Sequence, residues 1–306
     1  MDNEIGWELY RTFLAVLTEG SLSGAARALG ITQPTAGRHI AALEAALDQT
    51  LFTRSQTGLM PTEAAQALRG HAETMHATAA ALQRAATRHG QGIQGTVRIS
   101  ASEVIGMEVL PPTLARLRQA HPGLRIELAA TNRLQDLLHR EADIAVRMTA
   151  PRQDSLIARR VGSVTIGLYA HPDYLARCGT PAMPADLKQH ALIGFDVETP
   201  FLRAARTTLP AWMRDAWTRD AFALRADSDL AQLAMVRAGC GIGICQVALA
   251  RRVPPLTRVL PGQVAIPLET WITMHEDLRG NPACKAVFDA LVRCLLAHIA
   301  AGQAKA

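Results

Sequence analysis

Apolar residues recur at steps of three and four over most of the first 90 residues, and this spacing predicts helices. The first helix is expected over residues 7–19. Two shorter helices follow, with apolar positions at Leu22, Ala25, Ala26 and Leu29 and then at Ala36, Ile40, Leu43 and Leu47. The segment Gly30-Ile31-Thr32 between them has the length of the turn in a helix-turn-helix, because glycine can adopt a left-handed conformation and threonine can cap the next helix. The pattern therefore predicts a small head of three helices.

The exposed side of this head carries side chains that can bind bases or phosphates. The helix-turn-helix is expected from about Leu22 to Ala41, and the candidate DNA-binding residues are Arg27, Thr32, Gln33, Thr35, Arg38, His39 and Arg54. Most of them belong to the N-terminal half of the second short helix, the part that enters the major groove in helix-turn-helix proteins. Residues 54–61 are expected to form a small wing against the DNA backbone. The alternative is that these residues are ordinary solvated side chains on a helical hairpin.

The next predicted helix, over residues 62–89, has apolar residues at alternating steps of four and three. They are Ala65, Leu68, Ala72, Met75, Ala79, Leu82 and Ala86. Such a heptad seam favours a two-stranded coiled coil that pairs two heads, which two-fold DNA readers need. The seam is rich in alanine and buries little area, so the dimer should need further contacts elsewhere. The alternative is a helix that packs on its own domain.

The pattern changes at residues 90–95, GQGIQG, which indicate a hinge. Short apolar runs beyond it predict strands at 96–100, 124–130, 142–148, 163–170, 191–195, 222–226, 241–245 and 269–275. Helices are expected between or after them at 108–119, 134–141, 228–238 and 282–300. Alternating strands and helices favour a mostly parallel sheet with right-handed crossovers.

The net charge of +5 suggests an anionic partner, but the excess does not lie in the predicted head. Residues 1–90 contain seven arginines and eight carboxylates. DNA binding by the head would therefore depend on where Arg27, Arg38 and Arg54 lie, because phosphate attraction depends on the face presented. No apolar run approaches the length of a membrane span, and the acidic N-terminus lacks the features of a signal peptide, so we expect a cytoplasmic protein without a membrane partner.

Motifs for cofactor or metal chemistry are weak. The five cysteines form no CxxC pair and the ten histidines no HExxH, so neither a zinc site nor a disulfide framework is expected, and the thiols are expected to be buried and inert. No GxSxG elbow for a hydrolase exists. Gly239, Gly241 and Gly243 resemble a nucleotide loop, but no glycine follows at dinucleotide spacing, so close backbone packing is the preferred explanation. We expect no cofactor and no enzymatic activity.

The head resembles that of the LysR-type bacterial transcriptional regulators. The residues that carry the resemblance are Phe13, Gly20-Ser21, Ala25-Ala26, Leu29, Gln33-Pro34, Leu43-Glu44, Leu47, Leu51-Phe52, Arg54 and Pro61-Thr62. Two positions depart from the family pattern: Gly37 stands where serine is usual, and Asp48 where glycine is usual. A phosphate contact from the serine hydroxyl therefore cannot be carried over to Gly37. Further along, YAHPDYL, residues 184–187, AGCGIG and TMHEDLR resemble the family's effector domain.

The resemblance implies an all-α winged helix-turn-helix at 1–61, a linker and dimerisation helix at 62–89, a hinge at 90–95 and an α/β effector-binding domain at 96–306. This domain resembles periplasmic binding proteins, with lobe I at about 96–163 and 268–300 and lobe II at about 164–267. The implied function is effector-modulated transcription regulation by a homodimer or homotetramer on promoter or operator DNA, with RNA polymerase as a possible partner. The alternative is a solute-binding or enzymatic α/β protein with a non-functional DNA-binding head.

The effector is expected between the two lobes, because open parallel sheets bind ligands at the carboxyl ends of their strands. The residues expected there are Ser100, Ser102, Thr131, Arg147 and Phe201. They supply hydrogen-bond donors and an apolar wall without an evident carboxylate, which favours a small anion. The alternative is that the serines cap a helix and Arg147 makes a structural ion pair.

Overall fold

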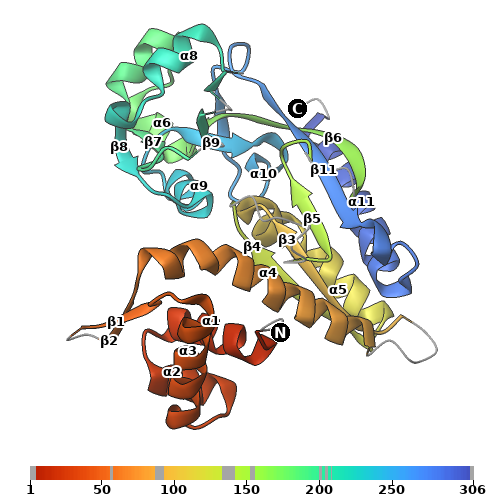
Figure 1. The fold of residues 1–306 in the computed structure, drawn as a ribbon. Helices are drawn as coiled ribbons and strands as arrows, with labels where there is room; N and C mark the ends of the chain where they lie inside the picture. The colour runs from red at the N-terminus through yellow and green to blue at the C-terminus, as the bar shows by residue number, and fades with distance from the viewer. Residues whose placement is uncertain are drawn as a thin grey trace. The chain divides into compact units, whose positions relative to one another are not determined.

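The computed structural model describes residues 5–55, 58–86, 93–132, 142–151, 156–199, 202–203, 206–207 and 209–303. The chain forms two compact units, one within residues 1–87 and one made of most of residues 88–306 (Figure 1). None of the helices in the described ranges is long and apolar enough to cross a membrane.

The first unit is a helical head with a two-stranded wing. Its elements are α1 (Trp7–Glu19), α2 (Leu22–Leu29), α3 (Gln33–Leu47), β1 (Phe52–Ser55), β2 (Gly58–Pro61) and α4 (Glu63–Ala86). Phe13 is fully buried and packs against Phe52, with the ring centroids 5.7 Å apart. Gly20 and Gly30 end α1 and α2 in left-handed conformations, which glycine adopts without steric cost. The predicted helix-turn-helix and wing are both confirmed.

The heptad seam on α4 divides into two halves. Ala65 and Ala72 are buried in the core of the head, and Leu68 packs against the same core. For this half, the alternative interpretation, a helix packed on its own domain, is therefore correct. Met75 and Leu82, one heptad apart, have exposed fractions of 39% and 61%. Only these two of the larger seam side chains present an apolar surface outside the head. The predicted helix end near His89 lies outside the described residues.

The second unit is built on a seven-stranded sheet with β9 beside β6 and the order β10-β6-β11-β5-β3-β4. Its strands are β3 (Gly95–Ala101), β4 (Leu124–Ala130), β5 (Ile144–Arg147), β6 (Leu156–Ala170), β9 (Gly243–Gln246), β10 (Thr257–Val259) and β11 (Ile266–His275). Among the described residues of this sheet, only β3 with β4 and β3 with β5 are parallel pairs. The predicted mostly parallel sheet is wrong, because two long strands, β6 and β11, pair antiparallel along ten residues. Gly95 already belongs to β3, so the expected hinge ends before it.

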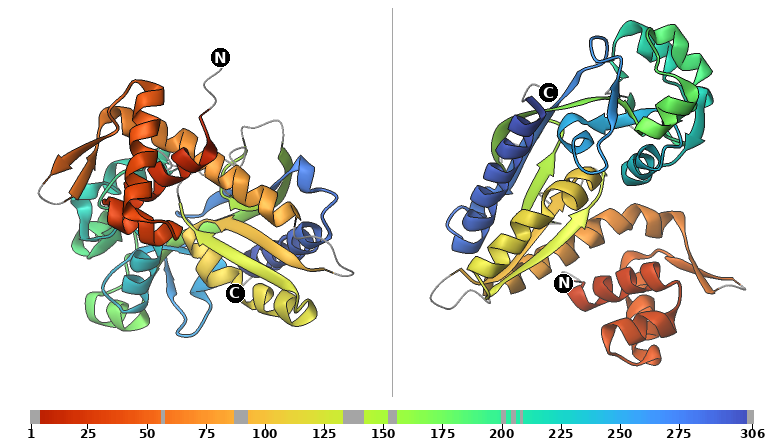
Figure 2. Two further views of the ribbon diagram at one scale, coloured as in Figure 1. Left: turned by 60° about the horizontal axis from the view of Figure 1, so that its bottom comes forward. Right: turned by 180° about the vertical axis from the view of Figure 1, so that it is seen from behind.

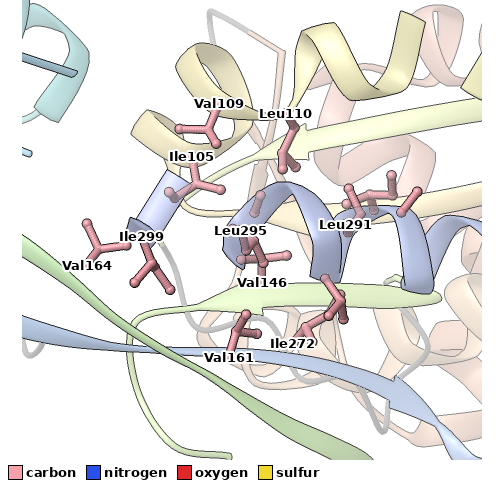
Figure 3. Close-up of a cluster of buried hydrophobic side chains, with 14 of the residues drawn as sticks. Ile105, Val109, Leu110, Val146, Val161, Val164, Ile272, Leu291, Leu295 and Ile299 are labelled. Carbon is pink, nitrogen blue, oxygen red and sulfur yellow. The ribbon is translucent and has the colours of Figure 1, made fainter. Parts of the chain in front are cut away.

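The two long strands pass through both lobes. Val164 lies opposite Leu268 in their register, near the positions where we expected the chain to cross. Val161 and Val164 belong to one buried cluster, whereas Leu168 belongs to a second. The first cluster fills the space between the sheet and the helices of lobe I. Those helices are a π-helical turn at Ile105–Val109, α5 (Pro111–Ala120) and α11 (Pro282–Gln303). Figure 3 shows Leu291, Leu295 and Ile299 of α11 in this cluster.

Lobe II contains a small parallel sheet of β7 (Leu192–Gly194) and β8 (Phe222–Arg225), which Figures 1 and 2 place away from α5 and α11. Its helices include α6 (Pro172–Cys178), α8 (Ala211–Ala216), α9 (Asp229–Arg237) and α10 (Val247–Ala250). The short elements β10, α6, α8 and α10 were not predicted, whereas α9 and α11 were. The helix expected at 134–141 lies outside the described residues.

The glycines at 241 and 243 serve close packing, as preferred from the sequence, whereas Gly239 serves a left-handed turn. A Cβ atom on Gly241 would overlap the carbonyl oxygen of Ala191, and one on Gly243 would lie 2.6 Å from Cγ2 of Val236. Gly239 has a φ of 72°, a left-handed conformation. These positions therefore exclude side chains for reasons of fold.

Candidate functional site

The N-terminus of α3 presents a row of polar side chains. The Thr32 hydroxyl accepts a hydrogen bond from the backbone N–H of Thr35 at 3.4 Å, which confirms Thr32 as the cap. The hydroxyls of Thr32 and Thr35 are 2.9 Å apart, and Arg38 Nη2 donates to Thr35 Oγ1 at 3.4 Å. Gln33 and Arg38 are exposed. The sequence thus brings a hydroxyl pair, an amide and a guanidinium to one end of one helix.

His39 is partly engaged inside the head. Its Nδ1 lies 2.8 Å from Thr12 Oγ1, and Thr12 is buried. The Thr12 hydroxyl donates its proton to the Glu8 carbonyl at 2.8 Å, so it accepts from Nδ1–H of His39. This bond fixes the ring against α1. The DNA contact expected from His39 is therefore restricted to Nε2.

Glu44 of α3 holds the wing against this helix by hydrogen bonds. Its Oε1 accepts from the backbone N–H groups of Leu51 and Phe52 at 2.7 and 3.2 Å. The other strand is held by Leu59 N–H, which donates to the Gly20 carbonyl at 2.9 Å. Arg54 pairs with Leu59 across the wing and is exposed, as is Arg27 on α2. The head therefore carries two further exposed guanidinium groups, one on α2 and one on the wing.

Glu44→Ala is expected to destabilise the head by about 2 kcal/mol, because it leaves two backbone N–H groups without their charged acceptor. Glu44→Gln keeps a carbonyl oxygen and should lose less. Urea unfolding followed by Trp7 fluorescence measures the effect, since Trp7 lies against α4 with its ring 6.0 Å from that of His76. The exposed Glu63 provides a control, Glu63→Ala. Equal unfolding midpoints for Glu44→Ala and Glu63→Ala would contradict this role.

The residues expected at the strand ends do meet in lobe I. Ser100 pairs in register with Ala129 on one side and Ala145 on the other, and Thr131 N–H donates to the Ala101 carbonyl at 2.8 Å. Ser100, however, is fully buried, and its hydroxyl accepts from Arg147 Nη2 at 2.7 Å. This pair is thus a structural hydrogen bond between two residues that were expected to face a ligand. Ser102 and Thr131 are half-buried. Phe201 lies outside the described residues.

Two carboxylates lie at the same edge, and the sequence interpretation missed both. Asn132 receives a bond from Glu103 N–H at 3.1 Å and donates from Nδ2 to Asp229 Oδ2 at 2.9 Å. Ser228, the cap of α9, donates to Glu103 Oε2 at 2.9 Å. The premise that no carboxylate joins the donors is therefore wrong. Asp229 comes from the other lobe, 97 residues after Asn132, and only its place at the start of a predicted helix could have indicated it.

Asp229 is reached by solvent, but surrounding protein atoms remove part of its hydration. This desolvation, followed by the nearby charge of Glu103, raises the pKa of Asp229 above its ordinary value. The bond from Asn132 opposes the shift. The edge where the lobes meet therefore holds a carboxylate whose negative charge is only partly compensated.

A cavity of about 160 Å³ opens beside this edge. Its walls are mainly apolar and come largely from lobe II; they include Phe195, Leu209, Trp217, Leu233 and Ile244. The polar and charged residues that line it are Arg206, Asp229, Gln232 and Gln246. None of the expected strand-end residues that the structure describes lines the cavity. Val104, two residues after Ser102, and Asp229 connect it to the strand ends.

Two further polar contacts join the lobes. Glu108 receives a bidentate bond from Arg237 at 2.7 and 3.0 Å and a contact from Arg252 at 3.3 Å. The bond from Arg237 lowers the pKa of Glu108 although burial opposes it. Buried His298 places Nε2 2.7 Å from Gln246 Oε1. Burial raises the pKa of the Cys245 thiol in the cavity wall to about 12, so this thiol is protonated and unreactive at neutral pH.

Two family models match the chain. Residues 7–66 match the bacterial regulatory helix-turn-helix protein of the lysR family, and residues 90–295 match the LysR substrate binding domain. The chain belongs to the LysR family. It is a LysR-type transcriptional regulator, with a DNA-binding head followed by an effector-binding domain. The fold class inferred from the sequence is thereby confirmed.

Individual relatives agree with this assignment. The uncharacterized HTH-type transcriptional regulator YhjC of Escherichia coli K12 is 30% identical over 261 residues, which are 84% of this chain and 86% of that protein. An HTH-type transcriptional regulator of Xanthomonas campestris is 30% identical over 181 residues, 58% of this chain, and the match spans only 52% of that protein. The solved structure of CrgA, a LysR-type transcriptional regulator from Neisseria meningitidis, shares the fold. Its TM-score is 0.57 at 22% identity, covering 96% of this chain and 99% of CrgA.

Proposed function

We propose that this LysR-type regulator reads promoter or operator DNA through the exposed end of α3. The observation that carries the proposal is the row formed by Gln33, Thr35 and Arg38, which projects from a capped helix braced by the wing. Gln33 would read a base edge, and Arg38 a phosphate or a guanine. Arg27, Thr32 and Arg54 would bind phosphates, and His39 would add a contact from Nε2. The regulator would act by binding alone, without catalysis or a cofactor. It would do so in the cytoplasm, where bacterial DNA lies.

The regulator is proposed to act as a homodimer or homotetramer. Support comes from Met75 and Leu82, which are exposed one heptad apart on α4 and therefore lie on one face of the helix. This short apolar strip buries little area, so contacts between effector domains would complete the assembly. Two heads would then read two half-sites on one face of the duplex. RNA polymerase would be a further partner at promoters.

The effector is proposed to bind in the cavity and at the adjoining strand ends, next to Ser102 and Thr131. Support comes from the position of Asp229, which lines the cavity and bonds to Asn132 of the other lobe. A ligand there would touch both lobes and would favour the lobe arrangement to which it binds better. The paired heads would respond to that arrangement and change their contact with DNA.

Substitutions on α3 test the DNA-reading proposal. Gln33→Ala is expected to relax sequence preference by about 1–3 kcal/mol at one position of each half-site, because one base edge loses its partner. Arg38→Ala is expected to weaken binding to all sequences and, if the contact is to phosphate, to reduce the slope of log affinity against log salt by about 1. Selection from a random DNA library followed by affinity measurements at several salt concentrations gives both quantities. Gln49→Ala, an exposed glutamine beyond the end of α3, is the control. Wild-type preference and salt slope in both variants would exclude these roles.

A further inference from the structure

The cavity in the effector domain has the size of one six-membered ring. Its volume is about 160 Å³, and a cavity of roughly 150 Å³ lined by Leu, Ile and Phe side chains is sufficient to bind benzene. Phe195 and Trp217 are buried in the lobe II core, and each lies edge-on to Phe222, with centroids 5.2 Å apart in both pairs. The walls formed by Phe195 and Trp217 are therefore packed from behind and keep their shape.

In the described part of the chain two charged residues line the cavity, and they differ in how far their charges are compensated. Arg206 donates from Nη1 to Glu198 at 3.3 Å and from Nη2 to the Arg214 carbonyl at 2.8 Å. Glu198 is shared with Arg203, but the side chain of Arg203 is 71% exposed and lies mostly in solvent. The charge of Arg206 is thus already paired with Glu198, and two of its five N–H donors have acceptors. An anionic ligand at Arg206 would compete with Glu198 for this charge.

Asp229 has a neutral partner and a free oxygen atom. Oδ2 accepts from the Asn132 amide at 2.9 Å, and within the described residues Oδ1 has no hydrogen-bond partner. The carboxylate of Glu103 adds negative charge nearby, and its own bond comes from the uncharged Ser228 hydroxyl. Desolvation, which raises the pKa of Asp229, also makes its ionised carboxylate less stable. A positive charge placed beside the carboxylate would offset this loss of hydration. The uncompensated charge on the cavity wall is therefore negative.

We propose that the effector is a small organic amine with an apolar body of about one ring, and that its ammonium group binds Oδ1 of Asp229 while the ring fills the cavity. The inference rests on the proposed function, in which this cavity is the effector site, and it replaces the anion expected from the sequence. A charge-assisted bond at this position would reduce the repulsion between Asp229 and Glu103 and leave the Asn132 bond in place. The ligand would thus stabilise the arrangement in which the two lobes meet at this edge.

Three matched probes test the charge preference on the full-length protein: benzylamine, benzyl alcohol and benzoate, titrated calorimetrically at neutral pH. We expect benzylamine to bind at least about ten times more tightly than benzyl alcohol, and benzoate to bind most weakly. Asp229→Asn preserves shape and should reduce benzylamine binding to the level of benzyl alcohol while leaving the alcohol unchanged. Asp220→Asn, at a side chain that is 92% exposed, should bind all three probes as the wild type does. Leu209→Trp, which fills the cavity, should abolish binding of every probe.

Tighter binding of benzoate than of benzylamine would overturn the proposal, as would benzylamine binding unchanged in Asp229→Asn. Binding of none of the probes at millimolar concentration would also overturn it. DNA binding by the ligand-free protein is measured in parallel, because it depends on α3 and not on this cavity. Intact sequence-specific DNA binding together with failed amine binding would reject only the effector class. Amine binding without sequence-specific DNA binding would reject only the DNA-reading proposal.

Discussion

Gly241→Ala is expected to destabilise the effector domain by on the order of 3 kcal/mol. A Cβ atom at this position would overlap the carbonyl oxygen of Ala191 and lie 3.0 Å from its carbonyl carbon. Two hydrogen bonds hold the backbone of Ala191 beside Gly241. Ile242 N–H donates to the Ala191 oxygen at 2.9 Å, and Ile193 N–H donates to the Ile242 carbonyl at 2.8 Å. Accommodating the methyl group would break these bonds beside β7, at the base of the cavity-bearing lobe.

The effect can be measured by thermal unfolding followed through the tryptophans of lobe II. For a domain of this size, a loss of about 3 kcal/mol corresponds to a decrease in Tm of about 6–12 °C. Gly262→Ala is the matched control in the same lobe, because an added Cβ there meets no atom within 4 Å. It should leave the Tm nearly unchanged. If Gly241→Ala and Gly262→Ala have equal Tm values, the backbone around Ala191 can move to accommodate the methyl group, and the prediction is wrong.

The free energy of unfolding is expected to fall by about 3 kcal/mol between pH 6.5 and pH 4 on account of His298. Burial, assisted by the charge of Arg252, lowers the pKa of His298 from 6.5 to about 4. The unfolded chain therefore binds a proton at this position over a pH range in which the folded protein does not. The stability that the neutral imidazole contributes is complete above pH 6.5 and is lost as the pH falls toward 4.

Urea unfolding at pH 7 and at pH 4.5 measures this loss. His298→Gln keeps an amide that can donate to Gln246 but has no titratable group, so its stability should depend much less on pH over this interval. His121→Gln, at a half-buried histidine near the end of α5, should retain the wild-type dependence. If His298→Gln and the wild type lose equal stability on acidification, His298 is not the group responsible.

The head was predictable because its determinants are local. The cap at Thr32, the left-handed Gly30 and the spacing of the apolar positions all act within a few residues of one another. The heptad seam on α4 was ambiguous for a physical reason. The same spacing of apolar residues can pack against a partner chain or against the helix's own domain. Its first half covers Phe13 and its neighbours in the head core, and nothing in the spacing distinguishes that half from the second.

The effector domain was predictable strand by strand but not in its pairing. Alternation of strands and helices favours parallel pairing, whereas the antiparallel pair of β6 and β11 joins segments about 100 residues apart in sequence. The surroundings of the candidate effector site depend on the same long-range pairing. Ser100 and Arg147 were expected to face a ligand, yet they bond to each other, and the carboxylate that lines the cavity, Asp229, is brought from the other lobe. Contacts between residues so far apart in sequence depend on the whole fold.

The most direct test of the account is the sequence selectivity of the full-length protein on fragments of bacterial genomic DNA that include its own promoter regions. Wild-type protein should enrich fragments that share two related half-sites separated by one helical turn or a multiple of it. Gln33→Ala should enrich fragments with relaxed preference at one position in each half-site. Enrichment of no common sequence by the wild-type protein, or identical preferences in Gln33→Ala and the wild type, would contradict DNA reading by α3.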